Sequence, residues 1–282
     1  MVMDILETII ANKRLEMARQ KEAVPLDLLL NLGSKRLDCK TVSVRQALER
    51  SRSGVIAEFK RRSPSKGWLH PNAKVKDVVP AYEKGGASAC SILTDSDFFG
   101  GSFTDLQQAH SLAKLPLLRK DFIIDEYQLY QARIMGADAV LLIAASLTKK
   151  ECKRLATTAH QLELEVLLEV HCEDELSRLN ENVDMLGVNN RHLGTFRTDV
   201  ENSFRLIEYM RSEAGEGREA PLFISESGIS AVEVVKRLRD AGFRGFLMGE
   251  VFMKTENPGE ALAQFIKNMT DEGTENKGLR DA

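Results

Sequence analysis

Eight short apolar runs, separated by longer amphipathic segments, are the feature that most constrains the fold of this chain. Each run has the length of a buried strand, and together they span residues 55–61, 88–94, 116–121, 139–144, 165–170, 185–189, 222–226 and 245–249. Strands that alternate with helical segments form β-α-β units, in which the strands lie parallel. Eight such units are the number in a (β/α)8 barrel, and the 282 residues accommodate its typical length of about 250. We therefore predict an α/β fold, a (β/α)8 TIM barrel.

The segments between these runs begin with residues that favour helix N-termini. Capping-box spacing occurs at Thr148-x-x-Glu151, Thr198-x-x-Glu201 and Ser230-x-x-Glu233, with a looser version at Asp125-x-x-Gln128. Asn257 precedes Pro258, which places a cap residue before a proline at the first helical position. These signals predict helices between the strands.

A doubly wound parallel sheet is the alternative architecture for alternating strands and helices. Such a sheet usually carries a glycine-rich turn, G-x-G-x-x-G, directly after its first strand. No G-x-G-x-x-G follows a strand candidate in this sequence. The barrel is therefore the preferred prediction.

A helical extension is predicted ahead of the first strand. Residues 1–50 contain three segments with helical patterning, at 4–20, 26–32 and 44–50, and Gly33 marks the expected end of the second. We expect this extension to pack on a barrel that spans residues 51–269.

Two polar segments are expected to lie outside the packed core. Residues 212–220 form a polar insertion before the seventh strand candidate, which predicts an exposed loop. Residues 270–282 contain almost no apolar side chain, which predicts a disordered tail. No linker and no second domain are indicated.

The charge balance limits the partners of this protein. Lys and Arg total 39 and Asp and Glu total 42, which gives a net charge of −3. A near-neutral chain disfavours nucleic acid and anionic membranes as partners, although a local basic pocket is compatible with it. No apolar run approaches the roughly 18 residues of a membrane span. We expect a small-molecule substrate, no nucleic acid, no membrane, and a monomer or weak homo-oligomer.

Cysteine usage and the N-terminal residues indicate the compartment. Cys39, Cys90, Cys152 and Cys172 are widely spaced and form no C-x-x-C pair, which is typical of reduced thiols. The N-terminal residues carry acids and helical patterning, unlike a secretory signal. We expect a cytoplasmic protein.

Polar residues gather where the predicted strands end. In a (β/α)8 barrel the active site lies at the carboxyl ends of the strands, so side chains from different strands meet there. The residues expected at this mouth are Glu58, Lys60, Lys120, Glu169, Asn189, Glu226 and Ser227. Two lysines and three carboxylates in one mouth form a coupled group whose pKa values separate, which suits general acid–base catalysis. Any one of them could equally be a structural ion pair.

A phosphate site is indicated at the last two strands. Ser227 and Gly228 follow the seventh strand candidate, and Gly249 ends the eighth. Barrels commonly bind phosphate here through backbone N–H groups, and glycine lets the backbone approach the anion closely. The loop at 62–67, RSPSKG, is basic and hydroxyl-rich, which also suits an anionic substrate.

Other features carry weaker hypotheses. His171 and Cys172 could suggest a thiol nucleophile, but no orienting partner is evident, and we interpret them as ordinary loop residues. The five histidines include no H-x-x-x-H pair, so we expect no metal. The pair at 98–99, FF, either caps the core or walls an aromatic substrate. Trp68 suggests a mobile lid or a contact surface.

Seven stretches together carry a family resemblance. They are AEFKRRSPSKG, SILTDSDFFGGS, LLRKDFIIDEYQ, LLEVHCEDEL, GVNNRHLGTFRTD, ISESGI and GFLMGEVFM, in this order between residues 55 and 253. The chain resembles indole-3-glycerol phosphate synthases. The resemblance implies a carboxy-lyase of tryptophan biosynthesis that needs no metal or organic cofactor. Its substrate would be 1-(2-carboxyphenylamino)-1-deoxyribulose 5-phosphate, which is closed to indole-3-glycerol phosphate with loss of carbon dioxide and water.

The resemblance also implies roles for individual residues. Lys120 would be the general acid and Glu169 the general base, Glu58 and Asn189 would hold substrate hydroxyls and catalytic groups in register, and Lys60 would serve substrate anions. The implied substrate-binding residues are Ser63, Phe99, Phe122, Leu141, Ile143, Arg191, Leu193 and Glu226. Among these, Arg191 would face the anthranilate carboxylate. The implied phosphate-binding residues are Ser227, Gly228, Gly249 and Glu250.

Two positions depart from the pattern familiar in that family. His192 stands where an Asp or Asn is more familiar, and Glu250 stands where Ser is frequent. A carboxylate pointing inward would repel phosphate, so we expect the Glu250 side chain to point away. Two alternative functions remain at this point: a Schiff-base aldolase acting on a sugar phosphate, and a non-catalytic barrel that binds a phosphorylated ligand.

Overall fold

The computed structural model describes residues 5–192, 194, 196–213 and 220–275. Its strands are β1 (Val55–Phe59), β2 (Arg62–Ser63), β3 (Gly67–Trp68), β4 (Ala89–Leu93), β5 (Leu117–Lys120), β6 (Ala139–Ile143), β7 (Glu165–Val170), β8 (Met185–Asn189), β9 (Leu222–Glu226) and β10 (Gly245–Met248). All except β2 and β3 coincide with the predicted strands, and their ends differ from the prediction by two residues at most. Lys60 and Asp121, which we placed in strands, lie just beyond β1 and β5, whereas Lys120, Asn189 and Glu226 end their strands.

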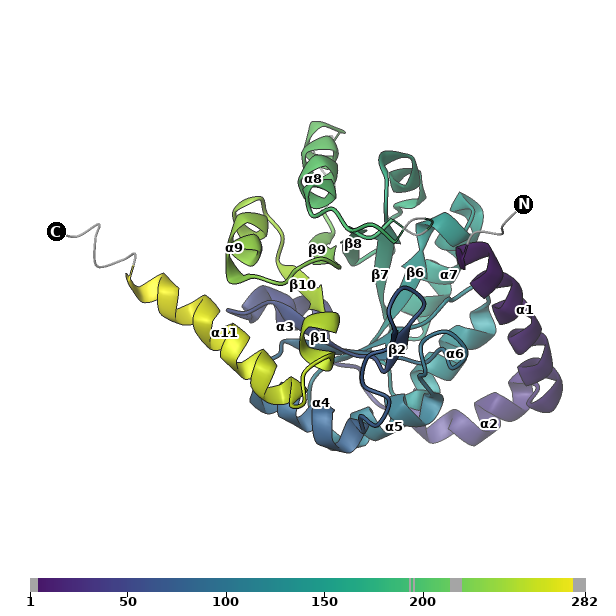
Figure 1. Ribbon diagram of the computed structural model, residues 1–282. Coiled ribbons are helices and arrows are strands. Elements are labelled where there is room, and N and C mark those ends of the chain that lie inside the picture. Colours follow the sequence, from purple (N-terminus) through teal and green to yellow (C-terminus); the bar gives the residue numbers. More distant parts are fainter. Residues whose placement is uncertain (1–4, 193, 195, 214–219, 276–282) are drawn as a thin grey trace.

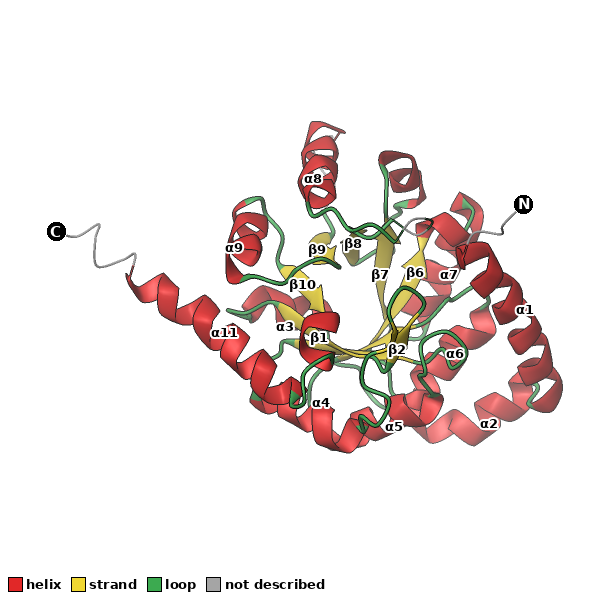
Figure 2. Ribbon diagram, viewed as in Figure 1, coloured by secondary structure: helices red, strands yellow, loops and turns green. Residues whose placement is uncertain are grey.

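The strands form a closed barrel within the described part of the chain. Their order around the barrel is β1-β10-β9-β8-β7-β6-β5-β4, and all neighbouring pairs are parallel. Figure 2 shows these strands inside a ring of helices. The predicted (β/α)8 TIM barrel is confirmed.

The helices surround and close this barrel. They are α1 (Ile5–Ala23), α2 (Leu26–Leu37), α3 (Val44–Arg50), α4 (Val75–Lys84), α5 (Phe103–Leu112), α6 (Glu126–Met135), α7 (Lys149–Gln161), α8 (Glu201–Glu213), α9 (Val232–Asp240), α10 (Glu250–Met253) and α11 (Pro258–Glu275). Two short 3-10 turns, η1 (Ala144–Ser146) and η2 (Glu173–Arg178), follow β6 and β7. Most of the buried apolar side chains lie between the strands and this outer helical layer.

The three N-terminal helices pack around the barrel and at its ends. Leu6 and Ile9 of α1 join the apolar cluster of the barrel interior near the carboxyl ends of the strands. Leu48 of α3 joins the same cluster close to Gly245, where β10 begins. α2 packs along α6, and Figure 1 shows α1 and α2 beside that helix. Burial of these apolar faces explains why the extension is ordered against the barrel.

Helix α2 runs past the position where we expected it to end. Gly33 lies inside α2, and a Cβ atom built there would come within 2.4 Å of Ile134 on α6. The glycine therefore permits close helix packing and does not terminate the helix, so this end prediction is wrong.

Some of the predicted helix starts are confirmed, and others are wrong. Thr148 and Asp125 both form capping boxes, as predicted, and Asn257 accepts a hydrogen bond from the Glu260 backbone. The predictions at Thr198 and Ser230 are wrong. Asp199 accepts the hydrogen bond from the first residue of α8, and α9 begins at Val232 without a side-chain cap.

The polar C-terminal segment is helical at its start. α11 continues to Glu275, beyond the expected boundary at 269, because each added residue extends an existing helical hydrogen-bond ladder. Residues 276–282 lie outside the described residues, as does most of the expected loop at 212–220, whose first two residues continue α8. No helix in the described residues is long and apolar enough to cross a membrane.

The loop after β1 contains the antiparallel hairpin β2–β3, which sequence reasoning did not predict. Trp68 at its end is 57% exposed, and the Arg62 guanidinium lies over the indole ring, 5.6 Å from its centroid. A Cβ atom at Gly100 would lie 3.0 Å from this ring. The indole therefore rests on the loop that follows β4.

Candidate active site

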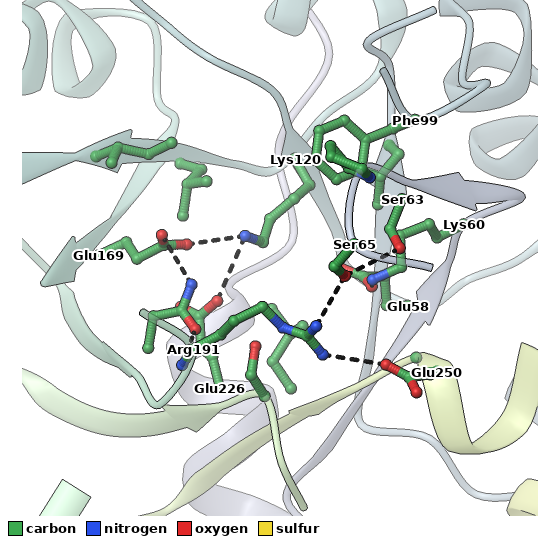
Figure 3. A pocket seen from close by; sticks show the side chains of 18 of the residues that line it. Glu58, Lys60, Ser63, Ser65, Phe99, Lys120, Glu169, Arg191, Glu226 and Glu250 are labelled. Carbon is green, nitrogen blue, oxygen red and sulfur yellow. Dashed lines mark hydrogen bonds and ion pairs between the residues drawn. The ribbon is translucent and has the colours of Figure 1, made fainter. Parts of the chain in front are cut away.

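One pocket at the carboxyl ends of the strands contains nearly all of the predicted site residues. Its lining includes Glu58, Lys60, Ser63, Phe99, Lys120, Phe122, Leu141, Ile143, Glu169, Asn189, Arg191, Glu226, Ser227, Gly228, Gly249 and Glu250. Figure 3 shows how many of these side chains point toward one another. Leu193 lies outside the described residues.

Strand register explains why residues far apart in the sequence meet. Lys120 is the last residue of β5, Asn189 is opposite Glu226 across β8 and β9, and Glu169 is opposite Ile143 across β6 and β7. Because side chains alternate between the two faces of a strand, these residues all point into the barrel. The expectation that polar residues from different strands meet at the carboxyl ends of the strands agrees with this arrangement.

Lys120 lies between two buried carboxylates. Its Nζ donates a hydrogen bond to Oε2 of Glu169 at 2.9 Å and lies 3.4 Å from Oε2 of Glu226. Burial alone would lower the pKa of Lys120, but Glu169, Glu226 and Glu58 hold it well above its usual range. The side chain is therefore an ammonium that can donate a proton.

Glu169 accepts from more than one side chain. Besides the Lys120 contact, Oε1 accepts a hydrogen bond from Nδ2 of Asn189 at 3.1 Å and lies 3.3 Å from Nε2 of His171. Burial would raise the pKa of Glu169, but Lys120 and His171 hold it well below its usual range. This carboxylate is therefore ionised.

Glu226 is the carboxylate that holds a proton most readily. Burial and the nearby carboxylates of Glu169 and Glu58 raise its pKa to about 7, although Lys120 opposes this. Its Oε1 atom is buried without a hydrogen bond. A Cβ atom at Gly187 on β8 would lie 2.2 Å from that oxygen, so the glycine makes room for the carboxylate.

Glu58 and Lys60 form an ion pair on the inward face of β1 and its continuation. Residues two apart on a strand point to the same face, which explains why the two side chains meet. A Cβ atom at Gly249 would come within 2.6 Å of Oε1 of Glu58, so β10 and β1 approach closely here. The glycine at this strand end thus has a packing reason in addition to any role in anion binding.

The turn after β9 presents its backbone to the pocket. Ser227 and Gly228 both have positive φ, 67° and 75°, and Nδ2 of Asn190 donates to the Ser227 carbonyl at 3.0 Å. A non-glycine residue in the left-handed region stores strain and is typical of functional sites. This turn and the backbone at Gly249 form one end of the pocket.

Arg191 reaches across the mouth of the pocket. Its Nη1 donates to Oγ of Ser65 at 2.8 Å, and its Nη2 donates to Oε2 of Glu250 at 3.0 Å, as Figure 3 shows. The Glu250 side chain therefore does not point away from the site, and that expectation is wrong. Attraction to the guanidinium outweighs the preference of an exposed carboxylate for solvent.

Apolar side chains form the opposite wall. The rings of Phe99 and Phe122 lie 5.8 Å apart, and Leu141 and Ile143 of β6 extend this surface. Phe98 and Phe99 both pack against the apolar cluster of the barrel interior, as the core-capping reading predicts, and Phe99 also lines the pocket. The chemistry available is thus an ammonium next to carboxylates, an apolar wall for a flat ring and a backbone cradle for an anion. Among the described residues, no cluster of His, Cys, Asp and Glu has the arrangement of a metal site.

Comparison with known families shows the family to which this chain belongs. The family model described as indole-3-glycerol phosphate synthase matches residues 6–265. The chain belongs to the indole-3-glycerol phosphate synthase family. Its activity is that of a carboxy-lyase that makes indole-3-glycerol phosphate in tryptophan biosynthesis. The phosphorylated small-molecule substrate of that reaction fits the pocket chemistry.

Individual family members agree with this assignment. An indole-3-glycerol phosphate synthase from Bacteroides thetaiotaomicron is 57% identical over 264 residues, covering 94% of this chain and 98% of the relative. The enzyme of the same name from a Polaromonas species is 42% identical, covering 93% and 98%. That of Neisseria meningitidis is 40% identical, covering 90% and 96%.

Solved structures with low sequence identity share the barrel. A mutant tryptophan synthase alpha-subunit from Pyrococcus furiosus superposes with a TM-score of 0.59 at 12% identity, covering 78% of this chain and 98% of that chain. A structure described as KGPDC from Streptococcus mutans gives a TM-score of 0.56, also at 12% identity, covering 77% and 97%. These similarities show the fold alone.

Sequence reasoning missed several residues of this synthase pocket. Ser65 and Asp121 line it, as do the apolar side chains Ile5, Leu6 and Ile9 of α1. The helical patterning of residues 4–20 predicted a packing face but not which surface it covers. His192 does not line the pocket; it is exposed, and its Nδ1 accepts a hydrogen bond from the Gly194 backbone.

The interpretation of His171 as an ordinary loop residue is wrong. Its ring lies between Glu169 and Glu175, so it has the orienting partner that we did not identify. The signal was present, since Glu169 and His171 are two residues apart and Glu175 follows four residues later. Cys172 is an exposed residue. Partial burial of its thiol and the charge of Glu175 raise the pKa of that thiol, which disfavours a thiolate nucleophile.

Proposed function

We propose that Lys120 is the general acid and Glu169 the general base of the synthase reaction. The observation that carries this proposal is the 2.9 Å hydrogen bond between Lys120 and Glu169 beside the apolar wall of the pocket. An acid and a base that share one hydrogen bond can exchange a proton after each has acted on the substrate.

Ring closure requires a proton on the substrate carbonyl oxygen. Lys120 donates this proton while the aromatic carbon attacks the carbonyl carbon, so the oxygen becomes a hydroxyl as the new carbon–carbon bond forms. The carboxylate on the attacking carbon then leaves as carbon dioxide, and its bonding electrons restore the ring. This step consumes one proton, which solvent returns.

Loss of water requires that one proton is added and one is removed, so this step consumes no net proton. Lys120, reprotonated by solvent, gives one proton to the departing hydroxyl, and Glu169 removes one proton from the new five-membered ring. After Lys120 has given up its proton, the carboxylate of Glu169 loses its nearest cation and becomes more basic. The proton that Glu169 takes can return to Lys120 across the hydrogen bond that they share.

Substrate orientation follows from the two ends of the pocket. The backbone at Ser227–Gly228 and Gly249–Glu250 binds the phosphate, with Ser63 in the loop opposite. The benzene ring lies against the four-residue apolar wall of Phe99, Phe122, Leu141 and Ile143. Arg191 then exchanges the Glu250 carboxylate for the carboxylate of the substrate.

The remaining polar residues position the reacting groups. Glu58 and Asn189 hold substrate hydroxyls and catalytic side chains in register, Lys60 attracts substrate anions, and Glu226 completes the hydrogen-bond network around Lys120. Leu193, proposed from the resemblance of its motif to the family, is the remaining substrate-binding residue.

The organisation of the whole chain is proposed on the same basis. Residues 1–50 form an extension packed on the barrel of residues 51–269, and the polypeptide is a cytoplasmic monomer or weak homo-oligomer. Its net charge of −3 supports the absence of nucleic-acid and membrane partners.

The test is to measure the fluorescence of the indole product with wild type and Lys120→Met. Because methionine preserves the apolar stem but carries no proton, kcat should fall by about 10²–10⁴-fold. Lys84→Met, which removes an exposed lysine on α4, is the matched control and should keep full activity. A fully active Lys120→Met variant would remove Lys120 from the acid role and make Lys60 the first candidate.

A trapping experiment distinguishes this mechanism from Schiff-base chemistry. A protonated ammonium has no lone pair with which to attack a ketone, and Lys120 is held in that form. Incubation with a sugar keto-phosphate and borohydride should therefore leave the protein mass unchanged. A reduced adduct at Lys60 or Lys120 would show an aldolase-type mechanism.

A further inference from the structure

His171 connects the site to a second carboxylate outside the pocket. It is the first residue after β7, and its ring is largely buried. Nε2 lies 3.3 Å from Oε1 of Glu169, and Nδ1 lies 3.3 Å from Oε2 of Glu175 on η2. The ring therefore bridges two carboxylates, and the inner one is the proposed general base.

The contacts of this ring determine its charge. Nδ1 faces the Glu175 carboxylate, to which an N–H at Nδ1 would donate, so a neutral ring with its proton there would direct the lone pair of Nε2 at the Glu169 carboxylate. Two facing lone pairs repel, whereas a proton on Nε2 makes the contact attractive. Burial would lower the pKa of His171, but Glu169 and Glu175 raise it to about 10. The ring is therefore an imidazolium at neutral pH.

Hydrogen bonds to the His171 backbone hold this loop in place and do not involve the imidazole ring. Oε2 of Glu175 accepts a 2.7 Å hydrogen bond from the His171 backbone N–H, and Nδ2 of Asn202 donates to the His171 carbonyl at 3.0 Å. These bonds fix the turn after β7 whatever side chain stands at 171. Nε2 itself is buried without an aligned hydrogen bond, and the Glu169 carboxylate 3.3 Å away is the charged group that it faces.

We infer that His171 is a positioning residue for the general base, a cation that keeps Glu169 ionised and aimed while Lys120 is without its proton. The inference rests on the proposed role of Glu169. When Lys120 donates its proton, its attraction for Glu169 ends, and the buried base is left near the carboxylates of Glu226 and Glu58. The imidazolium of His171, held from outside by Glu175, stays in place through that step.

The groups that face this ring define its pH response. Glu169 faces it from its own strand and Glu175 from η2, while Asn202 of α8 contributes a neutral amide. Lys120 from β5 and Asn189 from β8 contact the same Glu169 carboxylate, and Glu226 from β9 lies beyond Lys120. Removing the ring charge therefore acts first on Glu169.

The kinetic test compares wild type, His171→Gln and His171→Lys across pH. Loss of a cation at this distance should move the acid limb of kcat to higher pH by about one unit or more, which lowers kcat on that limb about tenfold. KM should change little, because His171 does not line the pocket. His171→Lys, which keeps a positive charge, should return the limb toward its wild-type position.

Three further samples make the test decisive. His160→Gln removes a histidine–carboxylate pair on α7, where Nε2 lies 2.9 Å from Asp184, and should leave the pH profile unchanged. Glu175→Gln removes the negative charge that faces Nδ1 of His171, so it should shift the acid limb of kcat in the same direction as His171→Gln. This variant tests the inference even if His171→Gln does not fold. In wild type at pH 8, nitrogen-15 spectra should show both ring nitrogens of His171 protonated.

The outcomes distinguish this inference from the proposed function. A neutral His171 ring at pH 8, or an unchanged acid limb in His171→Gln, overturns the inference. Glu169→Gln, assayed in parallel, should be inactive. If Glu169→Gln retains full activity, the base assignment itself is wrong, and the role of His171 is lost with it. An inactive Glu169→Gln together with an unchanged His171→Gln rejects the role of His171 alone.

Discussion

Single residues in this site are constrained by space as tightly as by charge. Glu226 occupies a buried position that exists because Gly187, on the neighbouring strand, has no side chain. The same relation holds between Glu58 and Gly249. In a closed barrel the inward-facing positions are packed in layers, so an acidic side chain of this length requires a glycine beside it.

Gly187→Ala is predicted to impair the site without changing the fold. The added Cβ would meet Oε1 of Glu226 and displace the carboxylate from Lys120, which should lower kcat by about 10²-fold and destabilise the protein by about 1–3 kcal/mol. Activity assays and urea denaturation measure the two effects. In the double variant Gly187→Ala/Glu226→Ala the stability loss should be smaller than the sum of the single losses. Simple additivity would show that the two side chains do not compete for space.

Sequence reasoning placed Lys120 and Glu169 in the pocket because strands impose a simple period. Once β5 and β7 are placed, Lys120 and Glu169 must face the barrel interior. It failed for His171 and Glu250, whose positions depend on partners in loops, Glu175 and Arg191. Loop geometry depends on contacts between distant segments, and no periodic pattern encodes it.

At the scale of elements, helix α1 is attached to the barrel by a buried charge. Nζ of Lys13 lies 3.0 Å from Asp95 and 3.0 Å from Asp121, and 2.7 Å from Glu16 on its own helix. Asp121 also pairs with Arg119 at 3.0 Å. Burial would lower the pKa of Lys13, but Asp121, Asp95 and Glu16 raise it above its usual range. The helix that covers the pocket is thus held by an ion pair next to Lys120.

Lys13→Met is predicted to loosen this attachment. Removing the Lys13 ammonium leaves the buried Asp95 carboxylate without this cation and Asp121 with Arg119 alone, which should reduce the free energy of unfolding by about 3–5 kcal/mol. KM should rise, because Ile5, Leu6 and Ile9 of the same helix line the pocket. Urea denaturation and steady-state kinetics test both effects. Lys21→Met is the control. It removes another lysine of α1, whose pair with Asp125 is exposed, and should change stability by at most about 1 kcal/mol.

Elements were predictable where local pattern and packing agree. The barrel strands follow from their apolar runs, whereas the hairpin β2–β3 is too short to leave a pattern. The end of α2 was misplaced because glycine usually ends helices, while Gly33 serves contact with Ile134. Tertiary packing overrides a local signal in that case.

For the whole molecule, the raised pKa of Glu226 predicts a pH-dependent stability. Its folded pKa of about 7 exceeds the unfolded value of about 4.3, so the folded state binds more protons between these values. The contribution of Glu226 to stability therefore falls as pH rises from about 4 to 7. Glu226→Gln cannot ionise and should lose less stability over that range than wild type. Denaturation midpoints at pH 5 and pH 7.5 measure this, and equal slopes in both proteins would contradict it.

The attachment of α1 through Lys13 also has a consequence for protein synthesis. α1 is the first described helix to leave the ribosome, yet Asp95 and Asp121, which hold it, are translated later. β1 likewise needs β10 for its second neighbour, so the barrel closes only after β10 has been translated. Until then the apolar face of α1 has no surface to cover. We expect nascent-chain chaperones to bind this early segment, and an N-terminal fusion that restrains it to delay the appearance of activity rather than the growth of the chain.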